Sequence, residues 1–287
     1  MNEVTAKTSL ACLLGSPVKH SFSPVMHNYA FQKLGIDCIY LAFDISKEQL
    51  KTTLDGLKAM QFVGCNLTMP LKTAVIPYLD ELSQVSRLTQ SVNTVVYQNG
   101  KLFGTSTDGK GYLTALAAKG YAIQNQKLVL LGSGGAATAI AVQAALDGAA
   151  EIAIFARHPY PRAEETAGII NEQTNCRATV HLLSDQDALR RELSDSLLLC
   201  NCTSVGMKPM EDACPISDAS VLHPDLLVTD IIYNPPKTKL LQMAEAAGCE
   251  TMNGLGMLLY QGALSFEAWT GQTMPVEEVK ALLPFQE

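Results

Sequence analysis

The sequence predicts an α/β protein with two domains, and three observations favour this fold class. Short apolar runs bounded by turn residues alternate with longer segments of helical period, which is typical of βαβ units and a mainly parallel sheet. A glycine-rich turn near residue 132 joins an apolar run to an alanine-rich segment, as at the start of a doubly wound sheet. The 287 residues, 47% of them hydrophobic, are enough for two ordinary cores.

The apolar runs give the expected strands, and one turn gives an expected hairpin. The pair Asn99 and Gly100 predicts a tight turn between residues 95–97 and 102–103, because both positions of this turn need positive φ. Strands are predicted at residues 10–15, 38–42, 62–67, 93–97, 127–131, 152–156, 178–182, 197–201 and 227–231.

Helix ends are indicated by capping residues in the first part of the chain. Ser23 is expected to cap a helix whose first residue is Pro24, and Gly35 is expected to end it. Ser46 and Gln49 have the spacing of a capping box before an apolar helix face. A further helix over residues 109–119 leads into the strand at 127–131, so we place the entry to the second domain near residue 109.

Composition limits the class of partner. A formal net charge of -7 and a pI near 5.3 argue against a broad nucleic-acid surface, so small-molecule partners are expected. No apolar run reaches the roughly 20 residues that span a bilayer, and the N-terminus lacks a signal-peptide pattern. We therefore expect no membrane partner and a cytoplasmic protein, either a monomer or a homodimer.

No metal site is expected from the histidines and cysteines. His20 and His27 have no third ligand at a suitable spacing, and no CxxC pair occurs. The cysteines, mostly inside apolar runs, are interpreted as buried reduced thiols at positions 12, 38, 65, 176, 200, 202, 214 and 249.

The glycine-rich turn is the first candidate binding site. In residues 127–146 a short apolar strand, Gly132, Gly134 and Gly135, and an alanine-rich helix follow one another. This context indicates a dinucleotide-binding turn, in which a bare backbone and a helix N-terminus receive a pyrophosphate. The alternative is a βα turn with a structural role only.

The end of the next predicted strand indicates which dinucleotide binds. An NAD site usually has a carboxylate there, which binds the ribose hydroxyls, whereas an arginine suits a 2′-phosphate. This chain has Arg157 and, shortly afterwards, Arg162, with no Asp or Glu in the turn. NADP(H) is therefore favoured and NAD(H) stays possible; the alternative is that both arginines are solvated loop cations.

Polar side chains also follow the strands of the first half. Ser21 and Ser23 stand where hydroxyls and free N–H groups could bind a carboxylate, unless Ser23 is only a helix cap. Asn66, Thr68 and Lys72 leave the next strand together, although a lysine at such a position is often just solvated.

Two further loops complete this polar set. Asn93 begins a predicted strand, and Asp108 follows the hairpin; the alternative for Asp108 is a role only as the cap of the next helix. A lysine, a carboxylate and several amides in successive loops are what oxidation of a polyhydroxylated substrate requires, namely a base and groups that orient the ring.

Eight motifs follow one another over nearly the whole chain. They are GSPVKHSFSPVMHN, NLTMPLK, SVNTV, TSTDG, LGSGGAATA, NCTSVGM, DIIYNPPKTKLL and NGLGMLLYQGA. This ordered series resembles that of the shikimate dehydrogenase family. The resemblance implies a reversible NADPH-dependent reduction of 3-dehydroshikimate to shikimate, in the pathway to aromatic amino acids.

The resemblance also implies a domain division and residue roles. A substrate domain of residues 1–108 plus 254–287 and a Rossmann-type NAD(P) domain of residues 109–253 would flank a cleft. Lys72 and Asp108 would be the catalytic pair, with Lys72 either the base or an electrostatic orienter. The implied substrate residues are Ser21, Ser23, Asn66, Thr68, Asn93, Tyr233 and Gln261. The implied cofactor residues are Gly132, Ser133, Gly134, Gly135, Ala136, Arg157, Arg162, Thr203, Ser204, Met207, Gly254 and Met257.

Departures from the family pattern leave two alternatives open. Dedicated NADP members have Asn-Arg-Thr where this chain has Ala156-Arg157-His158, and several later segments look more like the branch that accepts shikimate and quinate with either cofactor. A dual-specificity quinate/shikimate dehydrogenase is therefore the alternative within the enzyme class. A nucleotide-sensing module without chemistry is the alternative outside it, although such a module would be expected to lack Lys72, Asp108 or an intact glycine turn.

Overall fold

A computed structural model describes residues 4–284, which form two compact units. The first unit contains the described residues up to Thr107 together with Leu259–Pro284, and the second contains Asp108–Leu258. The domain boundaries predicted from the sequence fall after residue 108 and before residue 254. The second boundary lies later in the structure because helix α10 (Leu255–Thr270) runs through it without a break. Residues 1–3 and 285–287 of the predicted substrate domain lie outside the described residues.

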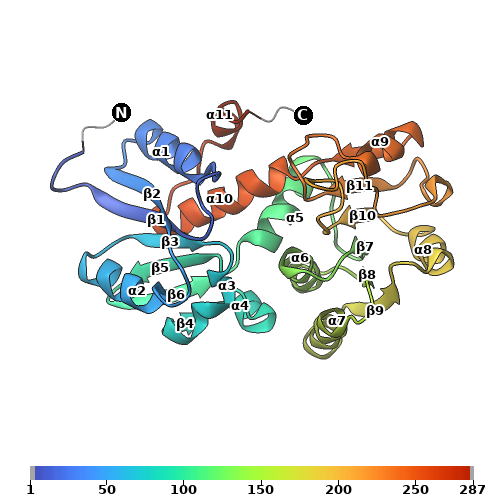
Figure 1. Ribbon diagram of the computed structural model, residues 1–287, viewed down its shortest axis with the longest axis horizontal. Helices are drawn as coiled ribbons and strands as arrows, with labels where there is room; N and C mark the ends of the chain where they lie inside the picture. Colours follow the sequence, from blue (N-terminus) through green and yellow to red (C-terminus); the bar gives the residue numbers. More distant parts are fainter. Residues whose placement is uncertain (1–3, 285–287) are drawn as a thin grey trace. The chain divides into compact units, whose positions relative to one another are not determined.

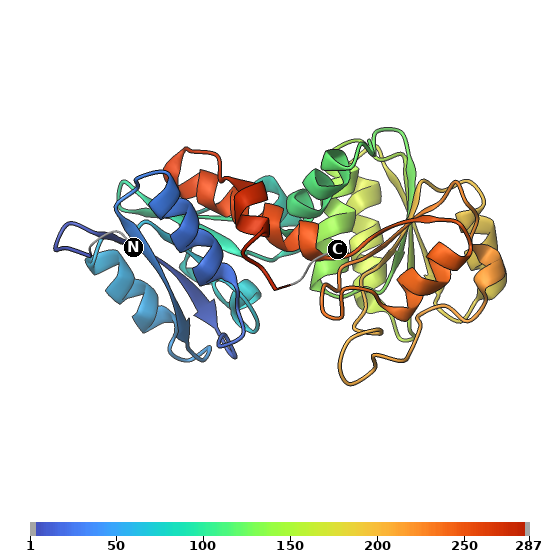
Figure 2. The ribbon, with the colours of Figure 1, turned by 90° about the horizontal axis from the view of Figure 1, so that it is seen from above.

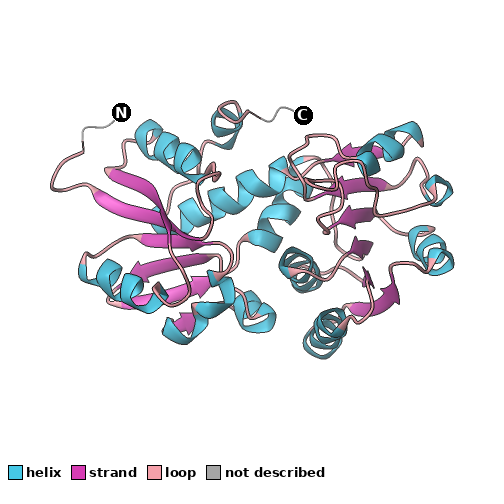
Figure 3. Ribbon diagram, viewed as in Figure 1, coloured by secondary structure: helices cyan, strands magenta, loops and turns pink. Residues whose placement is uncertain are grey.

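The first unit is built on a mixed six-stranded sheet, drawn in magenta in Figure 3. The spatial order is β2-β1-β3-β5-β6-β4, in which β3, β5 and β6 pair antiparallel and the other pairs are parallel. The strands are β1 (Ser9–Gly15), β2 (Cys38–Asp44), β3 (Gly64–Leu67), β4 (Glu81–Leu82), β5 (Thr94–Gln98) and β6 (Lys101–Thr105). The N-terminal end of β5 therefore lies beside the C-terminal end of β3, where the polar motifs gather.

Helices cover both faces of this sheet. Leu50, Leu54 and Leu57 of α2 pack into one core with residues of β1 and β3, because their spacing places them on a single helix face. On the other face, α1 packs against β1 and β2 (Figure 1). The helices are α1 (Ser23–Lys33), α2 (Leu50–Ala59), α3 (Leu71–Ala74), η1 (Ile76–Tyr78), α4 (Gln84–Thr89), most of α10, and α11 (Val276–Lys280).

The second unit is a doubly wound parallel sheet, as the sequence predicted. Its order is β12-β11-β10-β7-β8-β9, so the chain reverses direction across the sheet between β7 and β10. Figure 2 shows this sheet edge-on between two layers of helices. The strands are β7 (Lys127–Leu131), β8 (Glu151–Ala156), β9 (Arg177–Leu182), β10 (Leu198–Asn201), β11 (Leu227–Asp230) and β12 (Glu250–Met252).

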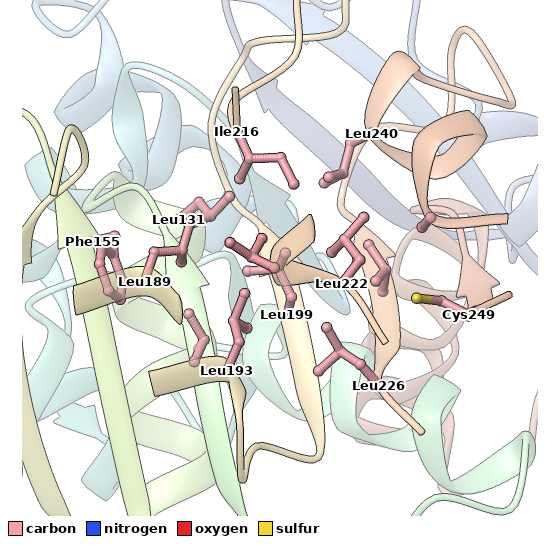
Figure 4. Packing of buried hydrophobic residues seen from close by; sticks show 14 of the residues in the cluster. Leu131, Phe155, Leu189, Leu193, Leu199, Ile216, Leu222, Leu226, Leu240 and Cys249 are labelled. Carbon is pink, nitrogen blue, oxygen red and sulfur yellow. The ribbon is translucent and has the colours of Figure 1, made fainter. Parts of the chain in front are cut away.

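Leucine-rich packing holds one face of this sheet. Leu189 and Leu193 of α8 and Leu240 of α9 lie against strand residues such as Leu131 and Leu199, as Figure 4 shows. All five side chains are fully buried. The helices of this unit are α5 (Asp108–Ala118), α6 (Gly135–Leu146), α7 (Pro161–Gln173), α8 (Gln186–Leu193), η2 (Ala219–Val221) and α9 (Lys239–Ala246). No described helix is long and apolar enough to cross a membrane.

Local predictions were confirmed in part. Asn99 and Gly100 adopt φ of 53° and 79°, which confirms the hairpin turn, and Gly35 ends α1 at φ 68°. The cap assigned to Ser23 was wrong: α1 begins at Ser23 itself, and the N-cap position is occupied by Phe22, which has no capping side chain. Only half of the capping box forms, since Gln49 accepts from the Ser46 N–H at 2.9 Å while the Ser46 hydroxyl donates to Glu48.

A buried histidine occupies the aromatic layer between α1, β2 and α10. The His27 ring stacks on Tyr40 with centroids 4.4 Å apart, and Trp269, Phe266 and Phe31 surround it. Neither ring nitrogen has a hydrogen-bond partner among residues 4–284. Burial lowers the pKa of His27 from 6.5 to about 3, because the charged ring would lie in an apolar layer without an acceptor.

The stability contributed by neutral His27 is expected to depend on pH. This contribution is complete above pH 6.5. It is lost as the pH falls from 6.5 to about 3, because in that range only the unfolded state binds the proton. Relative to wild type, His27→Leu should gain about 2 kcal/mol of unfolding free energy between neutral pH and about pH 5. Denaturant titrations at both pH values measure this difference, and a constant difference would contradict the assignment.

The wild-type protein must be compared with His27→Leu because a second buried group, Asp230, changes the stability with pH in the opposite direction. Burial raises the pKa of Asp230 from 3.8 to about 6, so its contribution is present at low pH and is lost as the pH rises through 6. Both proteins contain Asp230, and its contribution therefore cancels in the difference.

Candidate active site

A pocket of about 700 Å³ lies at the C-terminal ends of the strands in the second unit. It sits where the strand order reverses, between the segments that follow β7, β8 and β10, which is where doubly wound sheets bind ligands. Its lining residues are Gly132, Ser133, Gly134, Arg157, His158, Pro159, Tyr160, Pro161, Arg162, Leu183, Cys202, Thr203, Ser204, Val205 and Met210. None of these residues is acidic.

The glycines of the turn are there for different physical reasons. Gly132 has φ +104°, and a Cβ there would lie 2.9 Å from the Thr203 methyl carbon, so both conformation and space require glycine. Gly134 lines the pocket, and a Cβ there would meet no atom within 4 Å. A side chain at Gly134 would therefore project into the pocket, and glycine leaves the backbone accessible to a ligand.

Two arginines bring positive charge to this pocket. Arg157 follows β8 directly, and Arg162 lies in the first turn of α7 with its guanidinium 3.7 Å from the position of a Cβ on Gly135. Both residues are exposed. The pocket therefore combines a helix N-terminus and two cations, an arrangement suited to phosphate groups.

Several predicted cofactor residues lie outside this lining. Gly135 and Ala136 form the first turn of α6, whereas Met207, Gly254 and Met257 do not border the pocket. Gly254 has a packing reason of its own, because a Cβ there would lie 2.0 Å from the Ile231 carbonyl oxygen. The lining residues that were not predicted are His158, Pro159, Tyr160, Pro161, Leu183, Cys202, Val205 and Met210. For all of them except Leu183, the available signal was proximity in the sequence to Arg157 or to the NCTSVGM motif.

A buried polar network forms the candidate substrate half of the site, in the first unit. The Asn66 amide donates to the Asn93 carbonyl at 3.1 Å and to the Ser265 hydroxyl at 3.0 Å, and its oxygen accepts from the Tyr40 hydroxyl at 2.8 Å. Ser265 also lies 2.7 Å from the Thr94 hydroxyl. Tyr40 and Ser265 were missed because nothing in their local sequence marks them, whereas Thr94 lies in the SVNTV motif but was given no role.

Asn93 links this network to the chain around the predicted carboxylate. Its side-chain oxygen accepts from the Thr107 N–H at 2.8 Å, and its amide donates to Gln261 at 3.3 Å. The Thr107 hydroxyl donates to the Gln261 carbonyl at 3.0 Å. Asp108 follows Thr107 directly in the chain and is the first residue of α5. Its local position is therefore fixed through the backbone of Thr107.

Backbone hydrogen bonds bring the remaining first-unit motifs to the same sheet edge. Ser16 N–H donates to the Met69 carbonyl at 2.9 Å, which ties the serine loop to the segment after β3. Val92 N–H donates to the Lys72 carbonyl at 2.9 Å, which ties α3 to the residue before Asn93.

The predicted ligands in these loops are only partly accessible. Thr68, Lys72 and Ser21 are half-buried, and the Ser21 hydroxyl accepts from the Ser23 N–H at 3.2 Å. Tyr233 lies in the second unit after β11, where burial raises its pKa. The first unit thus assembles every predicted substrate residue except Tyr233.

Comparison with known proteins decides the family. A family model described as the shikimate dehydrogenase substrate binding domain matches residues 13–95, and a shikimate 5'-dehydrogenase C-terminal domain model matches residues 254–283. A shikimate dehydrogenase (NADP(+)) from Listeria innocua is 48% identical over 282 residues, covering 98% of this chain and 97% of the relative. This chain belongs to the shikimate dehydrogenase family.

Solved structures support the same assignment. Shikimate 5-dehydrogenase from Listeria monocytogenes, in complex with shikimate and NAD, is 46% identical with a TM-score of 0.97 and 98% coverage of each chain. A second member of the fold is quinate dehydrogenase from Corynebacterium glutamicum in complex with NAD. It is 28% identical with a TM-score of 0.86, over 96% of this chain and 98% of that chain. The shikimate dehydrogenase fold is therefore shared by proteins named for different ring acids.

Proposed function

We propose that this chain is an NADP(H)-dependent shikimate dehydrogenase, which interconverts 3-dehydroshikimate and shikimate in aromatic amino acid biosynthesis. The observation that carries the proposal is the pocket at the strand reversal, which is lined by bare glycine backbone and two arginines and has no acidic residue. Family membership supports the choice of substrate.

The pocket residues fit a nicotinamide dinucleotide phosphate. Open space at Gly134 and the N-terminus of α6 suit the pyrophosphate, and Arg157 and Arg162 suit the 2′-phosphate. When bound, the cofactor supplies hydride acceptance and donation. The chain itself would hold the phosphates through backbone N–H groups and guanidinium groups, and Thr203 and Ser204 also line the pocket.

The polar network of the first unit is proposed to hold the ring acid. Ser21 and Ser23 would bind the carboxylate. Thr68, Gln261 and Tyr233 would bind the ring hydroxyls, and Asn93, whose amide hydrogens are used by Thr107 and Gln261, would help shape that pocket. Asn66 already uses its amide within the network, so its proposed part is to hold Asn93 and the neighbouring wall in place. This assignment follows from hydrogen-bond capacity, because one amide nitrogen has only two hydrogens.

Lys72 and Asp108 are the proposed catalytic pair. Oxidation of the alcohol releases the proton of the substrate hydroxyl, and Lys72 Nζ would receive or stabilise that proton while the Asp108 carboxylate positions the lysine. Reduction of the ketone returns the proton along the same route. Hydrogen bonds anchor the backbones of Lys72 and Thr107, so both catalytic side chains start from fixed positions.

Arg157→Ala is expected to weaken NADP(H) binding about tenfold or more and to leave NAD(H) binding nearly unchanged, since only NADP carries the 2′-phosphate. The matched control is Arg177→Ala, which removes an exposed arginine at the start of β9, outside the pocket lining. The ratio of the KM values for the two cofactors measures the effect. Equal weakening of both cofactors would argue against a phosphate contact.

A dual-specificity quinate/shikimate dehydrogenase is the second candidate. The structural similarity to quinate dehydrogenase favours it, as does His158, which stands where dedicated NADP members have threonine. Shikimate and quinate share the carboxylate and neighbouring hydroxyls, so the residues above suit both acids. Quinate turnover comparable to shikimate turnover would establish this alternative.

Direct transfer of a labelled hydride tests the proposed function. Shikimate that carries deuterium at the carbon of the oxidised hydroxyl is mixed with NADP⁺ and the purified protein. The proposal expects 3-dehydroshikimate and reduced cofactor that retains the deuterium, detected by mass spectrometry. Absence of both products in the presence of wild-type protein would overturn it.

A further inference from the structure

A buried carboxylate at the end of β11 joins two segments of the second unit. Asp230 is 1% exposed. Its Oδ2 accepts from the Asn201 amide at 3.0 Å and from the Thr238 hydroxyl at 2.8 Å, and its Oδ1 accepts from the Ile232 N–H at 2.9 Å. Asp230 does not border the dinucleotide pocket. Its hydrogen-bond partner Asn201, however, contacts a residue that lines the pocket.

Asn201 connects Asp230 to the pocket wall through hydrogen bonds. Its amide donates to Asp230 and also to the Val205 carbonyl at 3.0 Å. Its oxygen accepts from the Thr203 N–H at 3.0 Å and from the Thr203 hydroxyl at 2.7 Å. If the Asn201 amide were flipped, its NH₂ group would face the Thr203 N–H, which is also a donor. Its oxygen would face the Asp230 carboxylate, which is also an acceptor. Asp230 therefore selects one orientation of the Asn201 side chain.

This orientation fixes the wall that faces the glycine turn. Thr203 and Val205 both line the pocket, and the Thr203 hydroxyl accepts from the Val205 N–H at 3.1 Å. The Thr203 methyl carbon lies 2.9 Å from the Cβ position of Gly132, so a shift of the wall would change the width of the pocket at the turn.

Thr238 provides a second attachment for the same loop. Its hydroxyl accepts from the Leu241 N–H and so caps α9. The Cβ of Thr238 lies 3.2 Å from the Cβ position of Gly206, which has φ +110°. The loop after β10 therefore packs on the residue that Asp230 binds.

We infer that Asp230 is a positioning residue for the dinucleotide, which acts through Asn201 on the wall formed by Thr203 and Val205. The inference rests on the proposed function, because it concerns binding of that cofactor. Asp230 is therefore expected to hold the wall in its binding conformation before the ligand arrives. This preorganisation lowers the entropic cost of ordering the wall when the cofactor binds.

Binding of NADPH to the protein without substrate tests the inference. Asp230→Asn keeps the shape but presents a donor where an acceptor is required, so the Asn201 amide loses its orientation. The Kd for NADPH, measured by fluorescence titration, is expected to rise about tenfold. Hydrogen exchange of the Thr203 and Val205 amides in the free protein should also become faster.

Thr238→Val separates positioning from general stability. It removes one hydrogen bond to Asp230 but keeps the Cβ and methyl group that pack at Gly206 and leaves the Asn201 contact, so it should lower the Tm while the Kd for NADPH stays within about twofold of wild type. Asn201→Ala is the second variant if Asp230→Asn does not fold, and it should raise the Kd similarly.

The outcomes distinguish the inference from the proposed function. Wild-type protein that does not bind NADPH would overturn the proposed function. Wild-type binding with an unchanged Kd in Asp230→Asn, or an equal loss in Asp230→Asn and Thr238→Val, would overturn the positioning role and leave the function standing.

Discussion

Lys72→Met is expected to lower kcat for shikimate oxidation about 1,000-fold, with only a small change in KM. Methionine keeps the length and apolar stem of lysine but removes the ammonium group that is proposed to manage the alcohol proton. The charge on that oxygen changes during the reaction, so the lost interaction belongs mainly to the transition state. Steady-state rates at saturating NADP⁺ measure the effect.

Two other substitutions make this result specific. Lys101→Met removes a lysine of the same unit whose ammonium pairs with exposed Glu81 at 2.9 Å, and kcat should not change. Ser21→Ala should mainly raise KM, because a carboxylate is bound equally before and during the reaction. A Lys72→Met protein with near-normal kcat would remove Lys72 from the mechanism.

Gly109→Ala is expected to destabilise the protein by about 3 kcal/mol, the upper end for added volume at a tight contact. A Cβ at this second residue of α5 would lie 2.2 Å from the Ala139 carbonyl oxygen and 2.7 Å from the Gln143 Cβ. The helix backbones of α5 and α6 would have to separate. Because Asp108 is the preceding residue, kcat should fall as well. Denaturant titration measures the free energy of unfolding, and initial rates measure kcat.

Gly168→Ala is the matched control in the same unit. Gly168 lies inside α7, and a Cβ there would meet no atom within 4 Å. Alanine should therefore stabilise the helix by about 0.5–1 kcal/mol through its better helix propensity. If the two variants changed stability equally, close helix packing would not explain the glycine at position 109.

The sequence allowed prediction of features that depend on neighbouring residues. The glycine turn, the hairpin at Asn99 and Gly100, and the parallel sheet of the second unit are local patterns, and the structure contains all three. The short strands β4 and β12 were not predicted, because two or three residues carry too little periodicity. Ser23 was misassigned as a cap because α1 begins with it.

The supporting network could not be read from the sequence. Ser265 and Asn66 are 199 positions apart, yet their side chains are hydrogen-bonded. Asn201 and Asp230 meet only because β10 and β11 pair in register. Such contacts follow from strand order, and strand order follows from the packing of both sheet faces.

The measurement that tests the central claim most directly is a four-way comparison of kcat/KM, with shikimate and quinate each assayed against NADP⁺ and NAD⁺. Absorbance of the reduced nicotinamide gives all four rates with one preparation of wild-type protein. The proposed function predicts that shikimate with NADP⁺ dominates. Comparable rates with quinate or NAD⁺ would instead support the dual-specificity enzyme, and no rate in any combination would contradict the assignment of Lys72, Asp108 and the arginine-lined pocket to dehydrogenase chemistry.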